Sequence, residues 1–219
     1  MRSTLCPQGL QRHNAVVPKT SAAGSKGVPR AQREQQILDA AASEFSRYGF
    51  AGAALSGVAA LAGVSRQLVL SYFGSKDGLY VACVERAGSN LIDRIERVVA
   101  AGEPPRQMAT ATLAAIFEAL EHRPQDWNVI MDRTQPVDGT ADTAAQGIRA
   151  VIEDQAARGV ANLANLHELT DPEDAAVLTD VWISMVTALV DYWLRHPEHS
   201  AASMSERSSR VLTALIGEL

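Results

Sequence analysis

Apolar residues recur every three or four positions over long stretches of the chain, while strict alternation of apolar and polar residues is scarce. The first such stretch begins near Ala31, where Ile37, Ala41 and Phe45 would share one face of a helix. Gly49 follows as a typical helix stop. The pattern therefore predicts a helix over residues 31–49.

Two short helices are predicted next, over residues 55–61 and 66–72. Gly63 allows a sharp turn between them, and Ser65 is a residue type that caps helix N-termini. Gly74 then breaks the pattern, and Ser75 is expected to cap a long helix that runs to about residue 101. Helix, short helix, glycine turn and short helix is the order of a helix-turn-helix.

The rest of the chain forms further periodic segments with prolines at their edges, at about residues 105–122, 125–133, 140–164, 172–196 and 200–218. Alanine is abundant, and aromatic residues make up only 5% of the chain, which favours helices over strands. We therefore expect an all-α fold.

The segment 172–196 carries two apolar stripes, and a helix with two apolar faces needs two partners. The last segment has a similar surplus of apolar residues. Pairing both helices with their copies in a second subunit would bury the extra faces in a four-helix bundle. The predicted homodimer interface consists of Val177, Val181, Ala188, Tyr192, Leu212, Leu215 and Ile216.

Cysteine usage and hydropathy narrow the class of protein. Cys6 and Cys83 lie far apart in the sequence, so neither a disulfide framework nor a cysteine metal site is expected. No uninterrupted apolar run approaches the roughly 20 residues that span a bilayer, and the N-terminus does not have the apolar core of a secretory signal. We expect a cytoplasmic protein without a membrane partner.

Charge is unevenly distributed along the chain. Residues 1–80 carry a net charge of +5 and residues 81–219 a net charge of −10. Such asymmetry suggests that the first part contacts a polyanion, although the excess could also reside in the N-terminal tail alone. Residues 1–30 contain no acidic residue and no periodicity, so we predict a disordered basic tail, which either attracts DNA or is an inert leader.

The second short helix carries side chains suited to DNA. Arg66 can bind a phosphate or guanine, and Gln67 can pair with adenine. Ser71 and Tyr72 can donate hydrogen bonds to phosphates, and Lys76 follows Ser75 at a helix N-terminus, which favours anions. The alternative is that the aromatic residues are core and the polar ones a solvated surface. We assign Phe73 to the core, with at least one of Leu68 and Val69.

Three stretches, "ILDAAASEFSRYGF", "VAALAGVS" and "YFGSKDGLY", together resemble the N-terminal signature of the TetR family of bacterial transcriptional regulators. The resemblance implies a nine-helix homodimer with a DNA-binding domain at residues 31–76 and a ligand-binding and dimerisation domain at residues 77–219. It also implies that the protein represses transcription from double-stranded operator DNA. A small-molecule effector would relieve repression by moving the fourth helix.

Departures from the family pattern fall in the DNA-binding part. Ala53 and Ala54 stand where a threonine usually caps the second helix, so a cap and a phosphate contact are expected to be missing, with Ser56 as a partial substitute. Leu70 replaces a tyrosine and could contact a thymine methyl group. The full set of predicted DNA contacts is Ser56, Ser65, Arg66, Gln67, Leu70, Ser71, Tyr72 and Lys76.

Large apolar residues among many alanines suggest an effector pocket in the second domain. The candidates are Phe117, Trp127, Met131, Ile152, Trp182 and Met185, with Asn128, Asp132, Arg133 and His167 as possible polar anchors. The ligand would be apolar or of mixed polarity. His196 and His199 have a ligand-like spacing, but Pro197 separates them and there is no third ligand, so neither a metal nor a cofactor is expected.

Two alternatives stay open at this point. The substitutions at Ala53, Ala54 and Leu70 are compatible with a regulator that has lost specific DNA binding and acts through protein contacts. An all-α enzyme that uses a cavity in the second domain is the other alternative, although no catalytic constellation is visible in the sequence.

Overall fold

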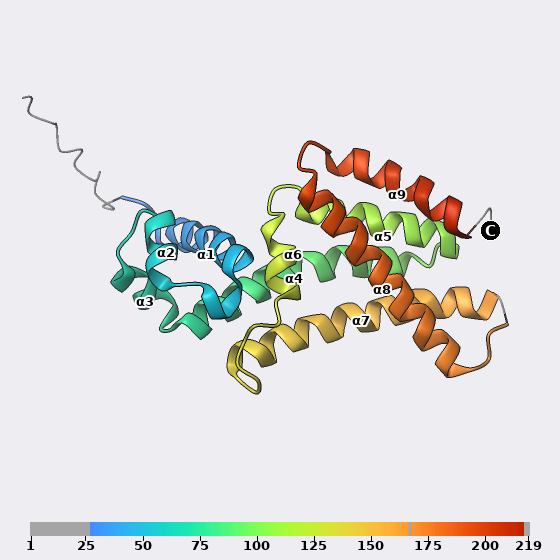
Figure 1. Cartoon of the computed structure of the whole chain (residues 1–219), viewed down its shortest axis with the longest axis horizontal. Coiled ribbons are helices and arrows are strands. Elements are labelled where there is room, and N and C mark those ends of the chain that lie inside the picture. Colours follow the sequence, from blue (N-terminus) through green and yellow to red (C-terminus); the bar gives the residue numbers. More distant parts are fainter. Residues whose placement is uncertain (1–26, 167, 217–219) are drawn as a thin grey trace, which may run out of the picture.

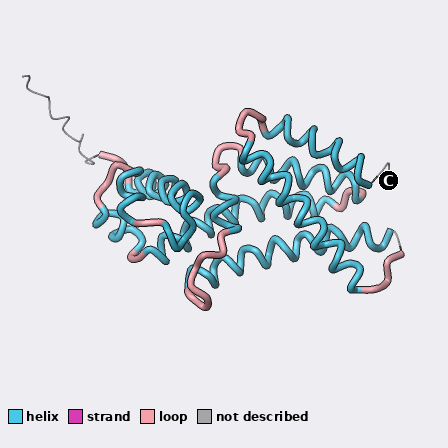
Figure 2. Tube along the Cα trace, in the orientation of Figure 1, coloured by secondary structure: helices cyan, strands magenta, loops and turns pink. Residues whose placement is uncertain are grey.

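The computed structural model describes residues 27–166 and 168–216, and within these residues it contains nine helices and no strand (Figure 1). Figure 2 shows the helices joined by short loops. The expected all-α fold is therefore confirmed for the described residues. Most of the predicted disordered tail (residues 1–26) and His167 lie outside them, as do residues 217–219.

The first three helices form a compact unit at one end of the molecule, which we call the head (Figure 1). They are α1 (Arg30–Gly52), α2 (Leu55–Leu61) and α3 (Arg66–Phe73). Ile37 and Phe45 of α1, Val58 of α2 and Val69 of α3 are all buried, and Phe73 is partly buried against this core. The assignment of Val69 and Phe73 to the core is thus confirmed.

Local sequence signals set the helix ends in the head. The Ser65 Oγ accepts a hydrogen bond from the Leu68 N–H at 3.1 Å, and the Ser75 Oγ accepts one from the Gly78 N–H at 3.0 Å, so both predicted N-caps are confirmed. Gly49 adopts a φ of 65°, which favours glycine. The chain is kinked there, and helical turns resume to Gly52 rather than ending at Gly49 as predicted.

The cap of α2 comes from a residue that the sequence analysis did not consider. Glu44 is buried in α1, and its Oε1 accepts a hydrogen bond from the Ala54 N–H at 3.2 Å. A Cβ on Gly57 would lie 2.3 Å from the same oxygen, so a glycine is needed for this approach. The carboxylate of Glu44 therefore fixes the start of α2 although Ala53 and Ala54 offer no side-chain cap.

The remaining helices form the body, and α4 runs from the head into it (Figure 1). Their bounds are α4 (Lys76–Ala101), α5 (Pro105–Leu120), α6 (Gln125–Met131), α7 (Thr140–Leu166), α8 (Pro172–Arg195) and α9 (Ala201–Ile216). The predicted segments match these helices, with ends that differ by a few residues. Close packing of α4 on α7 depends on Gly88, where a Cβ would lie 2.6 Å from Ile148.

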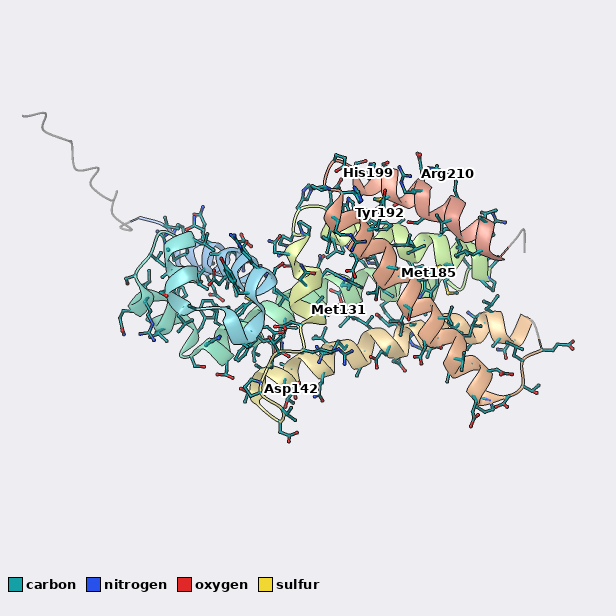
Figure 3. All side chains as sticks on the ribbon, in the orientation of Figure 1. Met131, Asp142, Met185, Tyr192, His199 and Arg210 are labelled. Atoms are coloured by element: carbon teal, nitrogen blue, oxygen red, sulfur yellow. The ribbon has the colours of Figure 1, made fainter. Side chains whose placement is uncertain are left out.

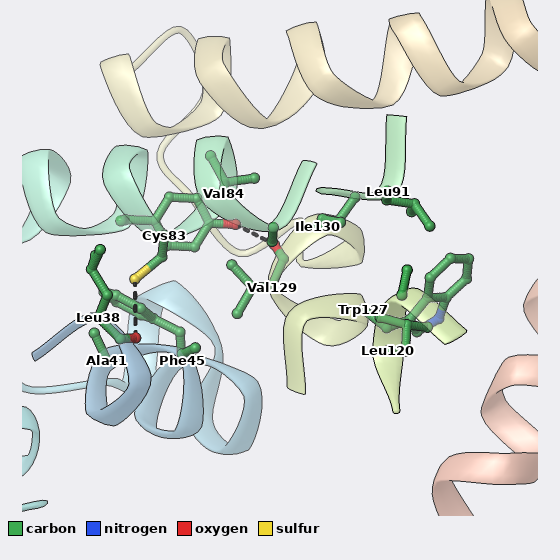
Figure 4. Packing of buried hydrophobic residues seen from close by; sticks show 14 of the residues in the cluster. Leu38, Ala41, Phe45, Cys83, Val84, Leu91, Leu120, Trp127, Val129 and Ile130 are labelled. Atoms are coloured by element: carbon green, nitrogen blue, oxygen red, sulfur yellow. Dashed lines mark hydrogen bonds between the residues drawn. The ribbon is translucent and has the colours of Figure 1, made fainter. Parts of the chain in front are cut away.

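A continuous core joins head and body (Figure 4). The buried ring of Tyr80 on α4 makes edge-on contacts with Phe45 at 5.0 Å and Phe50 at 5.3 Å between ring centres. Beside it, the Cys83 Sγ lies 3.8 Å from the Leu38 carbonyl oxygen, and burial raises the pKa of Cys83 to about 12. The head is thus held on α4 by buried contacts and not by a flexible linker.

Candidate functional site: the exposed face of α3 and an apolar cavity

The outer face of α3 presents polar side chains at the start of the helix. Arg66 and Gln67 are exposed and make no hydrogen bond to another described residue. Leu70, one turn later, is partly buried, and Ser56 on α2 is exposed. This arrangement leaves the first turn of α3 free to contact another molecule.

The other predicted DNA contacts are already engaged within the protein. The Ser65 Oγ caps α3, and the Ser71 Oγ donates a hydrogen bond to the Leu68 carbonyl at 2.7 Å. The Arg30 guanidinium lies 5.0 Å from the centre of the Tyr72 ring. The Lys76 Nζ lies 4.6 Å from the centre of the Phe50 ring and 3.5 Å from the Ala51 carbonyl oxygen. These side chains fix the geometry around α3.

The folded head is nearly neutral. Residues 27–80 contain five basic and four acidic residues, and the other four basic residues of the predicted basic part are Arg2, Arg12, Lys19 and Lys26. Most of the excess positive charge thus belongs to residues 1–26, outside the described residues, which agrees with the alternative that the tail carries it. Two of the acidic residues of the head make contacts within the protein: Glu44 caps α2, and Asp39 pairs with Arg86 at 2.7 Å.

The body contains a cavity of about 380 Å³ between α4, α5, α6, α7, α8 and α9. This volume falls within the range of about 300–1,000 Å³ that is usual for small-molecule sites. Its walls are almost entirely apolar. Met131 on α6 and Met185 on α8, both labelled in Figure 3, contribute to the same cavity from different helices.

Five of the six predicted pocket residues line this cavity: Trp127, Met131, Ile152, Trp182 and Met185. Phe117 does not, because its ring packs edge-on against Trp193 at 5.3 Å between ring centres and is fully buried. The neighbouring Ile116 lines the cavity instead. Leu91 and Ile95 of α4 also line it, although the sequence analysis placed no residue of this helix in the pocket.

The polar groups in the cavity wall differ from those predicted. Arg106, Thr112 and Gln155 line the cavity, whereas Asn128, Asp132 and Arg133 do not. The Arg106 Nη2 donates a hydrogen bond to the Thr213 Oγ1 at 2.7 Å, which ties α5 to α9. Gln155 is 1% exposed, so its amide is buried in an otherwise apolar wall.

Comparison with known proteins agrees with the sequence signature and with the fold. Residues 37–83 match the family model described as bacterial regulatory proteins, tetR family. The chain is 31% identical over 105 residues to the HTH-type transcriptional activator FasR of Mycolicibacterium smegmatis, an alignment covering 48% of each protein. The chain thus spans about half the length of this curated relative. It spans less of other relatives, such as 31% of RutR of Escherichia coli.

Residues 37–83 thus match the TetR family, and the fold of the described residues is TetR-like.

Solved structures of transcriptional regulators share the fold over most of the chain. A TetR-like transcriptional regulator from Rhodococcus sp. RHA1 superposes with a TM-score of 0.66 at 23% identity and covers 87% of this chain and 100% of that one. The regulator FadR from Bacillus subtilis, solved in complex with stearoyl-CoA, gives a TM-score of 0.62 at 15% identity over 84% of this chain and 99% of that one. At these identities the likeness concerns the fold.

In this TetR-like fold, α6 lies between the cavity and the head. The Asn128 Nδ2 donates a hydrogen bond to the Ser46 Oγ of α1 at 2.9 Å. The Asp132 Oδ2 accepts one from the Phe50 N–H at 2.6 Å, and the Thr134 Oγ1 accepts one from the Ala51 N–H at 3.1 Å. The end of α6 is therefore bonded to the backbone of α1 directly after the kink at Gly49.

The other side of the same turn is held by α7. Arg149 is buried, and its Nη1 donates hydrogen bonds to the carbonyl oxygens of Ile130 and Asp132, both at 3.0 Å. Met131, which lies between these two carbonyl groups in the sequence, lines the cavity. One short segment thus contacts the cavity, α7 and the head.

A buried charge cluster lies at the start of α6. Asp126 is 2% exposed, with its Oδ2 3.4 Å from the Arg123 Nε and its Oδ1 4.0 Å from Arg86 Nη2. Burial raises the pKa of Asp126, and the charges of Arg123 and Arg86 oppose this shift. Because Arg86 also pairs with Asp39, the cluster links α1, α4 and α6.

The two helices that carry the predicted dimer interface, α8 and α9, leave apolar side chains exposed. Val177 and Val181 on α8 are 62% and 58% exposed, and Leu215 on α9 is 67% exposed. Ala188 is exposed as well, whereas Tyr192 is partly buried. Leu212 is 4% exposed, so it does not belong to this outer face, whereas Val181 and Leu215 are exposed although they also line the cavity. The side chain of Ile216 is outside the described residues.

Among the described helices, α8 is the one that is long and apolar enough to cross a membrane, by length and composition alone. The sequence analysis had found no such segment. The two stripes account for its composition, because Trp182 and Met185 line the cavity while Val177 faces outward.

Proposed function

We propose that the chain is a transcriptional repressor that binds operator DNA as a homodimer and is released by a small apolar effector. Residues 31–76 would form the DNA-binding domain, and residues 77–219 the ligand-binding and dimerisation domain. The observation that carries the proposal is the position of α6, which contributes Trp127 and Met131 to the cavity and contacts α1 through Asn128 and Asp132.

DNA binding is supported by the free first turn of α3. In a helix-turn-helix, the second helix enters the major groove with its N-terminal residues against the base edges. Arg66 and Gln67 occupy these positions and are exposed. In a dimer, the two heads would read a palindromic site whose half-sites lie about 34–36 Å apart, or a multiple of that distance. The protein would do so in the bacterial cytoplasm.

An apolar effector is supported by the composition of the cavity wall. Trp127, Ile152 and Met185 give the cavity a surface that a hydrocarbon chain or ring system would fill. The structural neighbour FadR is a complex with stearoyl-CoA, which has a long acyl chain. This likeness favours ligands with an extended apolar part.

Coupling between the cavity and the head follows from the two helices that reach both. An effector in contact with Leu91 and Ile95 would shift α4, and one in contact with Met131 would shift the turn at Asp132. Either shift moves the head of one subunit relative to the head of the other. Because the half-site spacing is fixed by the DNA helix, a change in this distance lowers operator affinity.

The apolar outer face supports the homodimer. Val177, Val181 and Leu215 together leave an exposed surface of a kind that soluble monomers rarely carry. Pairing α8 and α9 with their copies would cover it.

The experiment that tests this function joins both activities. Duplexes selected by the purified protein from a random pool are bound again in the presence of fatty alcohols, fatty acids and acyl-CoA thioesters, and release is followed by fluorescence anisotropy. We expect at least one class to lower DNA affinity. Specific DNA binding that no apolar compound changes would contradict the effector assignment. If the ligand instead tightens DNA binding, the protein is a regulator that binds DNA in its ligand-bound form. A promoter reporter assay then decides whether it represses transcription or activates it, as the name of FasR says of that relative.

A further inference from the structure

The cavity is elongated along the helices around it. On α7 its lining residues recur with helical spacing from Ile152 to Leu163, and on α5 they run from Pro105 to Ile116. At a rise of about 1.5 Å per residue, each of these stretches is about 16 Å long. A ligand that fills the cavity is therefore extended and not compact.

The two ends of the cavity differ in their surroundings. Trp127 and Met131 of α6 line the end that is near the head. Leu215, close to the end of α9, lies at the part of the body away from the head (Figure 1). It lines the cavity and is 67% exposed, so the cavity reaches the protein surface there. A ligand that spans the cavity thus extends from the surface to residues beside the head.

Gly159 interrupts the row of side chains that α7 presents to the cavity. It lies on the same stripe as Gln155 and Leu163, one helical turn from each, and all three line the cavity. Because glycine has no side chain, the atoms that line the cavity at this position belong to the backbone of α7. A ligand can therefore approach the helix more closely here than at its neighbours on the stripe.

Packing between the helices does not require a glycine at this position. A Cβ added to Gly159 would meet only the Met108 Sδ of α5, at an ordinary contact distance of 3.5 Å. At Gly88, in contrast, a Cβ would lie 2.6 Å from Ile148. Met108 also lines the cavity, and methionine side chains are flexible. A larger side chain at residue 159 would therefore extend into the cavity beside Met108.

We infer that the effector is an elongated apolar molecule that packs against the α7 backbone at Gly159, and that this glycine sets the size of the ligand that the cavity accepts. The inference rests on the proposed function, because it takes the cavity as the effector site. Glycine is less favourable than alanine in a helix interior, and here it leaves room for a ligand. An effector of this shape contacts Met131 at one end and extends past Gly159 towards the other.

A series of straight-chain alcohols tests the inference on the full-length wild-type protein. Hexan-1-ol, octan-1-ol and decan-1-ol differ only in length. Trp127 and Trp182 line the cavity, so their fluorescence reports binding. Each further methylene group that becomes buried should tighten binding about fourfold. We expect this increase to continue from hexan-1-ol to decan-1-ol.

Leucine at residue 159 should shorten the longest chain that fits. Gly159→Leu places a branched side chain midway along the cavity, so the affinity should stop rising with chain length. Decan-1-ol should bind at least about tenfold more weakly than to the wild-type protein. Hexan-1-ol is short enough to bind on either side of residue 159, and its affinity should stay within about twofold of the wild-type value.

Alanine at the same residue keeps the test decisive if Gly159→Leu fails to fold. The added Cβ fits beside Met108, so Gly159→Ala should not lower the midpoint of thermal unfolding. It takes up the space of about one methylene group and should weaken the binding of decan-1-ol by about fourfold, with little effect on hexan-1-ol.

Gly147→Leu is the matched control. Gly147 lies on the same helix, is exposed and does not line the cavity. The same substitution there should leave the affinities for all three alcohols unchanged. An equal loss of decan-1-ol binding in Gly147→Leu overturns the inference. So does a dependence on chain length that is the same in the Gly159 variants as in the wild-type protein.

The wild-type results separate the inference from the proposed function. If the affinity does not rise beyond that for hexan-1-ol, the inference of an elongated ligand is wrong and the apolar effector site stays intact. If no alcohol changes the tryptophan fluorescence, the cavity does not take apolar ligands, and the effector part of the proposed function fails together with the inference.

Discussion

Arg66 lies at the exposed start of α3, where its guanidinium makes no hydrogen bond to another described residue. Replacing it with alanine should therefore weaken operator binding by about 1–3 kcal/mol, the usual contribution of a specific arginine contact. The free energy of unfolding should stay within about 0.5 kcal/mol of wild type, because no internal contact is lost. Anisotropy with a selected duplex and thermal unfolding measure the two quantities.

Arg97→Ala is the matched control for this variant. Arg97 is exposed on α4, far along the helix from the head, and its Nε donates a hydrogen bond only to the Asp93 carbonyl. The Arg97→Ala substitution removes one positive charge, as Arg66→Ala does, and should leave operator affinity nearly unchanged. Equal losses in both variants, or a stability loss in Arg66→Ala as large as that of a core substitution, would contradict a direct role of Arg66.

Single residues also show which contacts could be predicted from the neighbouring sequence and which could not. Ser65 and Ser75 could be predicted as caps because each bonds a backbone N–H three residues ahead. The cap of α2 could not, because Glu44 lies ten residues before the Ala54 N–H that it binds. Phe117 was placed in the pocket on size alone, and its rotation about α5 turns it towards Trp193 instead.

At the scale of elements, the contact between α4 and α7 depends on Gly88. Alanine there would bring a Cβ within 2.6 Å of Ile148, so Gly88→Ala should lower the free energy of unfolding by about 1–3 kcal/mol. A Cβ added to Gly147, the neighbour of Ile148 on α7, would have open space around it. Gly147→Ala should stabilise the protein by up to about 1 kcal/mol, as expected for a helix interior. Urea unfolding of both variants tests the packing, and stabilisation by Gly88→Ala would contradict it.

The turn after α6 carries the second element-scale prediction. Asp132→Ala removes the carboxylate that accepts hydrogen bonds from the Phe50 and Thr134 N–H groups at 2.6 and 2.9 Å. Ligand binding, followed by tryptophan fluorescence, should persist because Asp132 does not line the cavity. The decrease in operator affinity caused by the ligand should shrink several-fold, since the link to α1 is broken.

Asp93→Ala is the control for the turn. It removes one carboxylate from the exposed side of α4, where the Asp93 side chain makes no hydrogen bond to another described residue, and should leave the ligand response intact. An undiminished response in Asp132→Ala would show that α6 does not transmit the signal and that α4 alone does.

The positions of the helices were largely predictable from the sequence. Which neighbours each face of a helix contacts was not. Helical periodicity and prolines located α6 within a few residues, because both are local properties. Which face of this seven-residue helix meets the cavity depends on α1, α4 and α7, which are far away in the sequence. Asn128 and Asp132 were therefore expected at the pocket, although they contact the head.

At the scale of the whole molecule, the dimer interface can be tested apart from the cavity. Val177 is 62% exposed and does not line the cavity, unlike Val181 and Leu212. Val177→Glu would bury an unpaired carboxylate in the proposed interface and should yield monomers in analytical ultracentrifugation. Val137→Glu, at a residue that is 82% exposed in the loop before α7, should remain dimeric. A dimeric Val177→Glu would place the interface elsewhere.

The uneven charge of the molecule bears on the strength of DNA binding. With five basic and four acidic residues between positions 27 and 80, the head alone offers little long-range attraction for DNA. Specific recognition then depends on the direct contacts of α3. The sequence signature predicted the position of α3 correctly, but it did not reveal that most of the neighbouring polar side chains make contacts within the protein.

The most direct test of the account is selection of duplexes from a random DNA pool by the purified protein at two salt concentrations. The account predicts enrichment of a palindrome whose half-sites lie about 34–36 Å apart, or a multiple of that distance, and which persists at the higher salt concentration. Retention of DNA without enrichment, or no retention at either salt concentration, would contradict sequence-specific binding. The second result would favour a regulator that acts through protein contacts, or an enzyme that uses the cavity.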